Sequence, residues 1–517
     1  MTARFESGLD ADRRRAELEA LFSGDVAVDV LVIGGGITGA GIALDAAARG
    51  LKVVLVEKRD LAFGTSRWSS KLVHGGLRYL ASGQVSIARE SAIERGILMT
   101  RTAPHLIRAL PQVIPLHSSV SRLDEAVIRA GLRFGDLLRG SAGTPSTVLP
   151  SARRTSPQEV SAAAPTVRLE TLRGGAQSWD GQLVDDARLV VAVARTAAGH
   201  GASILTGVGA YDVDRTTATL RDEETGASAR VRAKIVINAA GVWAGEVDPR
   251  ISLRPSRGTH LVFDRSTFGG MSCSLTVPVP GERNRFVFAL PAPLGRVYVG
   301  LTDEITDGSI PDVPLATEPE IDFLLGVLAT AFEPAPTRAD VIGTFAGLRP
   351  LLNSGDGPTA DMSRRHAVID DGDGPIGIVG GKLTTYRLMA QHAVDAGVAA
   401  ANLTAGPCRT AALPLVGAAA PSVLAAVAAP DTLVRRYGTE ARLIQRLAIT
   451  IPGGSAPVAD GIDVIVAELA FSVGYEGARS VEDLLDRRTR IGLVAADRER
   501  ALPVAERILS EYGIGLP

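Results

Sequence analysis

A glycine-rich turn between two short apolar segments constrains this chain more than any other feature. Residues 29–33, DVLVI, have the composition of a buried strand, and residues 34–50 pass through glycines into an alanine-rich stretch typical of a helix. Residues 51–57, LKVVLVE, form a second apolar run of strand length. The order strand, glycine turn, helix and strand predicts the beginning of a parallel sheet.

The turn carries the dinucleotide-binding fingerprint G-x-G-x-x-G, formed by Gly34, Gly36 and Gly39. The first glycine permits a tight turn, the second lets a pyrophosphate approach the backbone, and the third lets helix and strand pack closely. Glu57 ends the second strand, 21 positions after Gly36, where a carboxylate accepts hydrogen bonds from a ribose. This acid argues against a ribose 2′-phosphate. The fingerprint alone leaves FAD and NAD undivided.

Composition excludes several classes of protein. The chain has 517 residues, 46% of them hydrophobic, and a net charge of −2, so it offers no general attraction to nucleic acid. Its two cysteines, Cys273 and Cys408, cannot by themselves build a disulfide framework or a metal site. The charged N-terminal stretch does not resemble a secretory signal, and no apolar run reaches the roughly 18 residues of a membrane span. We therefore expect a cytoplasmic protein without a metal, in contact at most with a membrane surface.

The rest of the chain predicts an interleaved domain order. Residues 103–121 contain prolines and residues 141–157 are rich in Ser, Thr, Pro and Gly, which predicts loops or linkers. Residues 251–349 are rich in strand-forming segments, which predict an antiparallel hairpin among them, and helical periodicity dominates from about residue 406. We predict an α/β fold with a Rossmann-type FAD-binding domain, an interleaved antiparallel-sheet substrate domain and a C-terminal helical domain. The expected limits are an N-terminal extension (1–27), the FAD-binding domain (28–105, 158–250 and 340–405), the substrate domain (106–157 and 251–339) and the helical domain (406–517).

Six motifs together resemble the FAD-dependent glycerol-3-phosphate dehydrogenases. They are GGGITGAG (34–41), SSKLVHGGLRYL (69–80), NAAGVW (238–243), LTDE (301–304), FAGLRPL (345–351) and GGKLTTYR (380–387). The resemblance runs from about residue 28 to the C-terminus, and the second and last motifs are the most specific. It implies oxidation of sn-glycerol 3-phosphate to dihydroxyacetone phosphate, with hydride transfer from C2 to N5 of a non-covalently bound FAD.

The resemblance also implies which residues surround the cofactor. His74 and Gly75 would lie against the flavin ring without a covalent bond, and Ala210 would meet the adenosine through its backbone. The other implied contacts, besides the fingerprint glycines and Glu57, are Thr65, Ser66, Ser70, Leu72, Ala240, Gly241, Gly381, Leu383 and Thr384.

The GGKLTTYR motif has a physical logic of its own. Gly380 and Gly381 end a strand and leave room for a flat ring, and Leu383 and Thr384 begin a helix. The amide groups and positive end of that helix would stabilise negative charge on a reduced flavin.

Several cations are expected to converge on the phosphate of the substrate. The candidates are Arg78, Arg349, Arg364 and Lys382, with Tyr79 shaping the pocket. His260 matches the histidine of the family's active site and is our candidate for the general base, titrating near its ordinary pKa of about 6.5. Arg349 or Lys382 could instead stabilise the developing alkoxide, with His260 as a hydrogen-bonded structural residue.

The electron acceptor and partners follow less directly. Oxygen-using members of the family carry an internal insertion that this chain lacks, which favours a quinone as acceptor. Apolar residues at helical spacing between 120 and 137, interleaved with arginines, fit a helix lying on a membrane surface or one packed on its own protein. We expect peripheral contact with the inner face of the cell membrane and a homodimer. The competing hypotheses are an amine- or amino-acid-oxidising relative and a flavin-binding protein without catalytic activity.

Overall fold

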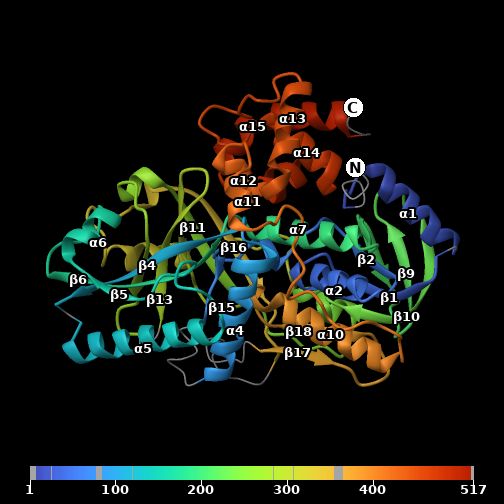
Figure 1. Cartoon of the computed structure of the whole chain (residues 1–517), viewed down its shortest axis with the longest axis horizontal. Coiled ribbons are helices and arrows are strands. Elements are labelled where there is room, and N and C mark those ends of the chain that lie inside the picture. Colours follow the sequence, from blue (N-terminus) through green and yellow to red (C-terminus); the bar gives the residue numbers. More distant parts are fainter. Residues whose placement is uncertain are drawn as a thin grey trace.

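The computed structural model describes residues 7–24, 26–76, 84–118, 120–282, 285–306, 308–353 and 365–513. Figure 1 shows two β-sheets side by side, with the helices of the C-terminal region above them. Among the described residues, no helix is long and apolar enough to cross a membrane.

The first sheet is built on the strand–helix–strand unit that the sequence predicts. β1 pairs in parallel with β2 and with β10, and the sheet has the order β17-β18-β10-β1-β2-β7, with β8 and β9 attached beside β10. Its strands are β1 (Val28–Ile33), β2 (Val53–Glu57), β7 (Ser203–Thr206), β8 (Val208–Tyr211), β9 (Thr217–Asp222), β10 (Ser228–Asn238), β17 (His366–Ile369) and β18 (Ile376–Gly380).

Both faces of this sheet are covered, which explains why its central strands are apolar throughout. Val30 and Val32 pack in one core with residues of α2 (Ile37–Ala48), α7 (Asp186–Gly199) and α10 (Tyr386–Ala400). Leu31 and Ile33 face the other side and share a core with Leu18 of α1 (Ala11–Ser23). The N-terminal segment is thus a helix docked on the sheet (Figure 1).

The second sheet is largely antiparallel and has the order β15-β11-β14-β13-β12-β4-β6-β3, with β16 beside β11 and β5 beside β6. The expected hairpin is confirmed as the antiparallel pair β13–β14. The strands are β3 (Leu72–Val73), β4 (Ile107–His117), β5 (Arg153–Thr155), β6 (Leu172–Leu183), β11 (Ser256–Asp264), β12 (Ser274–Pro278), β13 (Phe286–Ala292), β14 (Arg296–Gly300), β15 (Glu304–Ile305) and β16 (Val341–Arg349). Its main helices are α4 (Val85–Ile97), α5 (Arg122–Ser141), α6 (Pro157–Ala163) and α9 (Glu318–Leu328).

The prediction of a loop over residues 103–121 is wrong for most of its length. Residues 107–117 form β4, which pairs with β6 over nearly its whole length and with β12 at only two positions. A proline removes one ladder donor, and the strand tolerates Pro115 next to a register shift. Ile107, Leu110, Val113 and Leu116 of β4 are buried, and this burial outweighs the missing donors.

The two sheets exchange more strands than the expected domain limits suggest. β6 lies within 158–250 and β16 within 340–405, yet both pair in the second sheet. The limits given above therefore stay a proposal.

The C-terminal region is helical and is anchored on the loop that follows β2. Arg488 donates to both carboxylate oxygens of Asp60, and Arg487 donates to one of them. Burial alone would raise the pKa of Asp60, but these two arginines lower it to about 2. The elements are α11 (Pro421–Ala425), α12 (Asp431–Tyr437), η8 (Gly438–Glu440), α13 (Ala441–Thr450), α14 (Val466–Glu476), η9 (Asp483–Arg488), η10 (Ile491–Leu493) and α15 (Ala495–Tyr512).

Candidate active site

A large cavity begins at the glycine turn and extends between the two sheets. Its volume is about 1910 Å³, above the roughly 300–1,000 Å³ that small-ligand pockets usually have. Residues of both sheets line it, so it offers room for a dinucleotide together with a small substrate.

The fingerprint glycines are required by the backbone geometry at the start of α2. Gly34 has a φ of +111°, and a Cβ there would lie 2.6 Å from the carbonyl oxygen of Ala239. A Cβ at Gly39 would lie 1.9 Å from the carbonyl oxygen of Gly34, so only glycine permits this contact between helix and turn. Gly34 and Gly36 line the cavity, whereas Gly39 packs behind them. The positive end of α2 therefore faces the cavity, as a pyrophosphate requires.

Glu57 and Ser66 organise this turn. Glu57 Oε2 accepts a hydrogen bond from the amide of Gly35 at 2.6 Å, and its other oxygen accepts from the amide of Arg59 at 2.8 Å. Burial raises the pKa of Glu57, and these two amide donors oppose the shift. Ser66 Oγ accepts from the amide of Ile37 at 2.9 Å, which ties the loop after β2 to the first turn of α2.

The structure brings nearly all the predicted cofactor residues to one cavity. Those that line it are Gly34, Gly36, Glu57, Thr65, Ser66, Ser70, Leu72, His74, Ala210, Ala240, Gly241, Gly381, Leu383 and Thr384. Gly75 lies just behind the lining, where its amide donates to both carboxylate oxygens of Asp180 at 3.1 Å. Arg95 pairs with the same carboxylate at 2.6 Å, so this buried ion pair holds the segment that carries His74. These residues fit a flavin dinucleotide.

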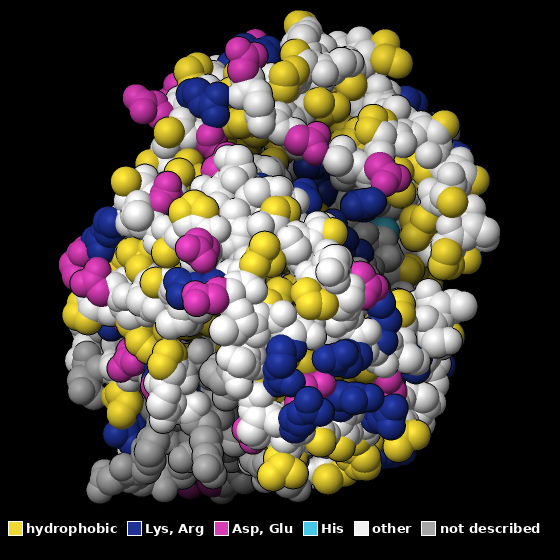
Figure 2. Space-filling model, turned by 90° about the vertical axis from the view of Figure 1, so that its left-hand side faces the viewer, with side chains coloured by type: hydrophobic (Ala, Val, Ile, Leu, Met, Phe, Trp, Pro, Cys, Tyr) yellow, Lys and Arg dark blue, Asp and Glu magenta, His cyan; other side chains and the backbone are white. Residues whose placement is uncertain are grey.

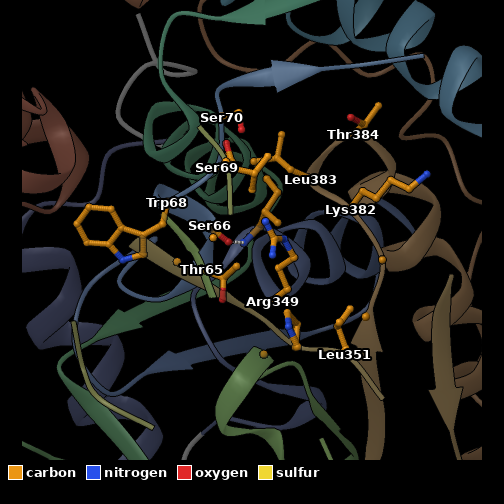
Figure 3. Close-up of a pocket in the computed structure, with 18 of the residues that line it drawn as sticks. Thr65, Ser66, Trp68, Ser69, Ser70, Arg349, Leu351, Lys382, Leu383 and Thr384 are labelled. Atoms are coloured by element: carbon orange, nitrogen blue, oxygen red, sulfur yellow. Dashed lines mark hydrogen bonds between the residues drawn. The ribbon is translucent and has the colours of Figure 1, made fainter. Parts of the chain in front are cut away.

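The turn after β18 also faces the cavity. Gly380 and Gly381 have φ values of +75° and +77°, and Leu383–Thr385 form the short helix η7 that leads into α10. Lys382 lines the cavity, but its Nζ donates to Ser91 Oγ of α4 at 3.0 Å. In Figure 3 the Lys382 side chain extends away from Arg349.

Arg349 projects from the end of β16 into the cavity with a fixed orientation (Figure 3). Its Nη1 contacts Asp303 Oδ1 and Ser256 Oγ, both at 3.0 Å, and its Nη2 donates to the carbonyl of Thr302 at 3.0 Å. Asp303 belongs to the LTDE motif, in which the sequence alone indicated a role for no single residue.

His260 lies on β11, directly opposite Phe345 of β16 and Gly300 of β14. Only 1% of its surface is exposed, and its Nε2 lies 2.9 Å from Ser70 Oγ. A Cβ at Gly300 would lie 2.2 Å from the imidazole, so this glycine makes room for the ring.

The expectation that His260 titrates near 6.5 is wrong. Burial, together with the nearby charges of Lys71 and Arg349, holds the pKa of His260 well below 6.5. Lys71 is buried against Asp186 at 2.9 Å. Neither Lys71 nor Asp186 was predicted from the sequence, because nothing in the local pattern distinguishes a buried ion pair from an exposed one.

Three predicted substrate residues, Arg78, Tyr79 and Arg364, lie outside the described residues.

Two solved structures resemble this fold. The glycerol-3-phosphate dehydrogenase from Bacillus halodurans complexed with FAD is 28% identical, with a TM-score of 0.73 over 97% of this chain and 94% of its own. The dithionite-reduced L-alpha-glycerophosphate oxidase from Mycoplasma pneumoniae with FAD bound is 19% identical, with a TM-score of 0.56 over 75% of this chain and 99% of its own, and shows a shared fold.

Proteins found by sequence comparison are more similar to this chain than these two solved structures are. Residues 29–387 match the FAD dependent oxidoreductase family, and residues 408–513 match the C-terminal domain of alpha-glycerophosphate oxidase. Glycerol-3-phosphate dehydrogenase 1 of Mycobacterium tuberculosis is 57% identical over 98% of this chain and 99% of its own length. Glycerol-3-phosphate dehydrogenase of Synechocystis is 34% identical over 92% and 90%. With the fingerprint, the flavin-sized cavity and the match over nearly its whole length, the chain belongs to the FAD-dependent glycerol-3-phosphate dehydrogenases.

Proposed function

We propose that this chain oxidises sn-glycerol 3-phosphate to dihydroxyacetone phosphate in the cavity between the two sheets. The observation that carries the proposal is that Arg349 and His260, from paired strands, reach the same cavity as the dinucleotide fingerprint. Bound FAD supplies the acceptor for the hydride that leaves C2. The protein residues bind the phosphate, orient the carbinol and take its proton.

Arg349 is the proposed main phosphate ligand. Its contacts with Asp303, Ser256 and Thr302 fix the plane of the guanidinium before substrate arrives, so little side-chain entropy is lost on binding. We propose Arg78, Arg364 and Lys382 as further cations around the same anion, with Tyr79 at the pocket wall.

His260 is the proposed general base. Its lowered pKa keeps the imidazole neutral at ordinary pH, and in the tautomer that carries its proton on Nδ1 the lone pair lies on Nε2. Because His260 is nearly inaccessible and Ser70 Oγ lies beside Nε2, we propose that the C2 hydroxyl gives its proton to Ser70 as the Ser70 proton moves to His260. The serine ends the step as it began, and the imidazole carries the proton.

We further propose that electrons leave for a membrane quinone and that α5 is the contact with the membrane. The helix exposes Leu123 (79%), Val127 (70%), Phe134 (42%) and Leu137 (69%). Arg122, Arg129 and Arg133 are exposed on the same helix. Apolar side chains flanked by cations suit the boundary of an anionic lipid surface. Figure 2, which views the side of the molecule that carries α5 and α6, shows Lys and Arg side chains grouped next to hydrophobic ones.

The cavity extends to the same helix. Val127 and Phe134 of α5 line it together with Ile114, Phe286 and Phe288. An apolar extension that reaches from the cofactor site to a lipid-facing helix suits a lipid-soluble quinone ring. A homodimer at the inner face of the cell membrane rests on the family resemblance alone, and sedimentation of the purified protein tests the dimer.

Anaerobic mixing with glycerol 3-phosphate tests the proposed reaction. The flavin absorbance should bleach, and one dihydroxyacetone phosphate should form per flavin. A water-soluble quinone analogue should then restore the oxidised spectrum faster than oxygen does. If glycerol 3-phosphate leaves the spectrum unchanged while an amino acid bleaches it, the substrate assignment is overturned.

A further inference from the structure

His260 belongs to a stack of three rings that connects the cavity with the C-terminal helical region. Its imidazole lies over Phe345 with ring centroids 4.5 Å apart and planes 9° from parallel. Phe345 in turn stacks on Trp68 at 6.0 Å and 24°. Tyr298 meets Phe345 edge-on at 5.4 Å, which holds it from the side. These separations are in the range of favourable aromatic pairs.

The other end of the stack meets the C-terminal helical region. The Arg490 guanidinium lies 5.0 Å from the centre of the Trp68 ring, and its Nη2 donates to the carbonyl of Arg67 at 2.7 Å. Its Nε pairs with Asp185 at 3.2 Å, and only 4% of the residue is exposed. Figure 3 shows Trp68 directed away from Ser66 and Thr65, and Trp68 is also one of the residues that line the cavity.

The C-terminal helical region packs tightly against β16. Leu493 and Val494 share an apolar cluster with Phe345 and Tyr298, and Trp68 packs against it. A Cβ at Gly343 would lie 2.2 Å from the carbonyl oxygen of Leu493, so backbone meets backbone here. A shift of the C-terminal region must therefore move β16 or the rings on it.

We propose that Arg490, Trp68 and Phe345 are positioning residues that let the C-terminal helical domain set the orientation of His260. This inference rests on the proposed role of His260 as the base. A flat stack restricts rotation of the imidazole about its χ2 bond, which keeps Nε2 directed at Ser70. Phe345 is not one of the described residues that line the cavity. In this proposal it therefore acts on the reaction through His260.

The charges around His260 determine how a loosened stack would be detected. Two positive charges oppose protonation of the imidazole: Lys71, from the segment after η2 (Thr65–Arg67), and Arg349, from β16. Lys71 is paired with Asp186, and Arg349 is paired with Asp303. Removing a ring admits water beside the imidazole and weakens the burial that lowers its pKa. The acidic limb of the pH–rate profile should then move upward, toward about pH 6.5.

The experiment compares Phe345→Leu and Trp68→Leu with Trp68→Phe, which keeps a ring, and with Phe268→Leu as a matched control. Phe268 is fully buried in the second sheet's core, edge-on to Phe263 and Phe332. Stopped-flow reduction of the FAD-loaded variants should be about tenfold to a hundredfold slower for the two ring-deleted proteins. Their acidic limb should move upward, and Trp68→Phe should retain most of the rate. Phe268→Leu should lose comparable thermal stability with an unchanged rate and pH profile. Equal rates in Phe345→Leu and Phe268→Leu would overturn the proposal.

A double-mutant cycle tests the link to the C-terminal domain. Arg490→Met and Trp68→Leu should slow reduction by less together than the product of their separate effects, whereas Arg490→Met and Phe268→Leu should act independently. Arg490→Lys serves if the methionine variant does not fold. Independent effects in both pairs would overturn the link. The His260→Ala variant distinguishes the proposed base from the proposed ring stack. A small loss of rate in that variant would refute His260 as the base, while coupling between Arg490 and Trp68 would still be measurable.

Discussion

Ser70 Oγ and His260 Nε2 lie 2.9 Å apart, although the two residues are 190 positions apart in the chain. The contact joins the cavity-lining segment after β2 to β11 of the second sheet. In the proposed reaction the hydride leaves C2 and the proton leaves the hydroxyl oxygen on C2. This hydrogen bond joins the two residues proposed to receive the proton.

Replacing His260 by alanine should leave FAD bound and slow flavin reduction by about 10²–10⁴-fold. The neutral imidazole is the active form, and its pKa is lowered, so the wild-type rate should stay flat down through pH 6.5 and fall only well below it. Stopped-flow reduction across pH measures both effects. A wild-type limb centred at 6.5, or a loss below tenfold in the variant, contradicts this assignment.

Replacing Arg349 by alanine should lower kcat/KM for glycerol 3-phosphate, because a charge-assisted contact with phosphate is lost. The decrease should correspond to a loss of about 2–4 kcal/mol of transition-state stabilisation. Arg338→Ala is the matched control, since Arg338 is half exposed and pairs with Glu318 on the surface. Steady-state kinetics with an artificial acceptor measures both. Glycerol should be a very poor substrate of the wild type, and comparable turnover of glycerol would refute a phosphate site.

Replacing Asp303 by asparagine should raise KM more than it lowers kcat. The guanidinium of Arg349 keeps its charge but loses the carboxylate that orients it at 3.0 Å. An unchanged KM would show that Asp303 does not prepare the site for phosphate.

Acid or heat should release the FAD into solution, because the cofactor is held by the cavity without a covalent bond. Flavin that precipitates with the protein would contradict this and implicate His74. Glu57→Gln should lower the FAD content, since a neutral amide accepts hydrogen bonds more weakly than a carboxylate. Absorbance of the purified proteins gives the ratio of flavin to chain.

Replacing Leu123 and Leu137 together by aspartate should abolish binding to vesicles that contain anionic lipid, while solution kinetics with a soluble acceptor stay near wild type, because neither residue lines the cavity. Ile449→Asp is the matched control, because Ile449 on α13 is 84% exposed and lies outside α5. Cosedimentation with anionic and neutral vesicles measures the difference. Equal loss in the Ile449 variant would show that α5 has no special role.

The sequence was most informative where chemistry and backbone geometry coincide. Gly34, Gly36 and Glu57 could be placed because a pyrophosphate turn demands those residue types at that spacing. The pairing partners of His260 could not, since strands β11, β14 and β16 meet only in the folded sheet.

Two local rules misled for physical reasons. Prolines at 111 and 115 predicted a loop, yet burial of the apolar side chains of β4 and its pairing with β6 keep it in the sheet. The ordinary pKa of histidine misled at His260 because its burial and the nearby positive charges of Lys71 and Arg349 come from tertiary structure.

The two arginines that hold Asp60 have a consequence for the chain as a whole. Replacing both Arg487 and Arg488 by leucine in the full chain would leave Asp60 buried without either of the arginines that pair with it. Leaving one buried charge without its partner costs about 3–5 kcal/mol, a large part of a typical domain's stability. We therefore expect the helical region not to behave as a separable module, and heat should unfold the two ends of the chain in one cooperative transition.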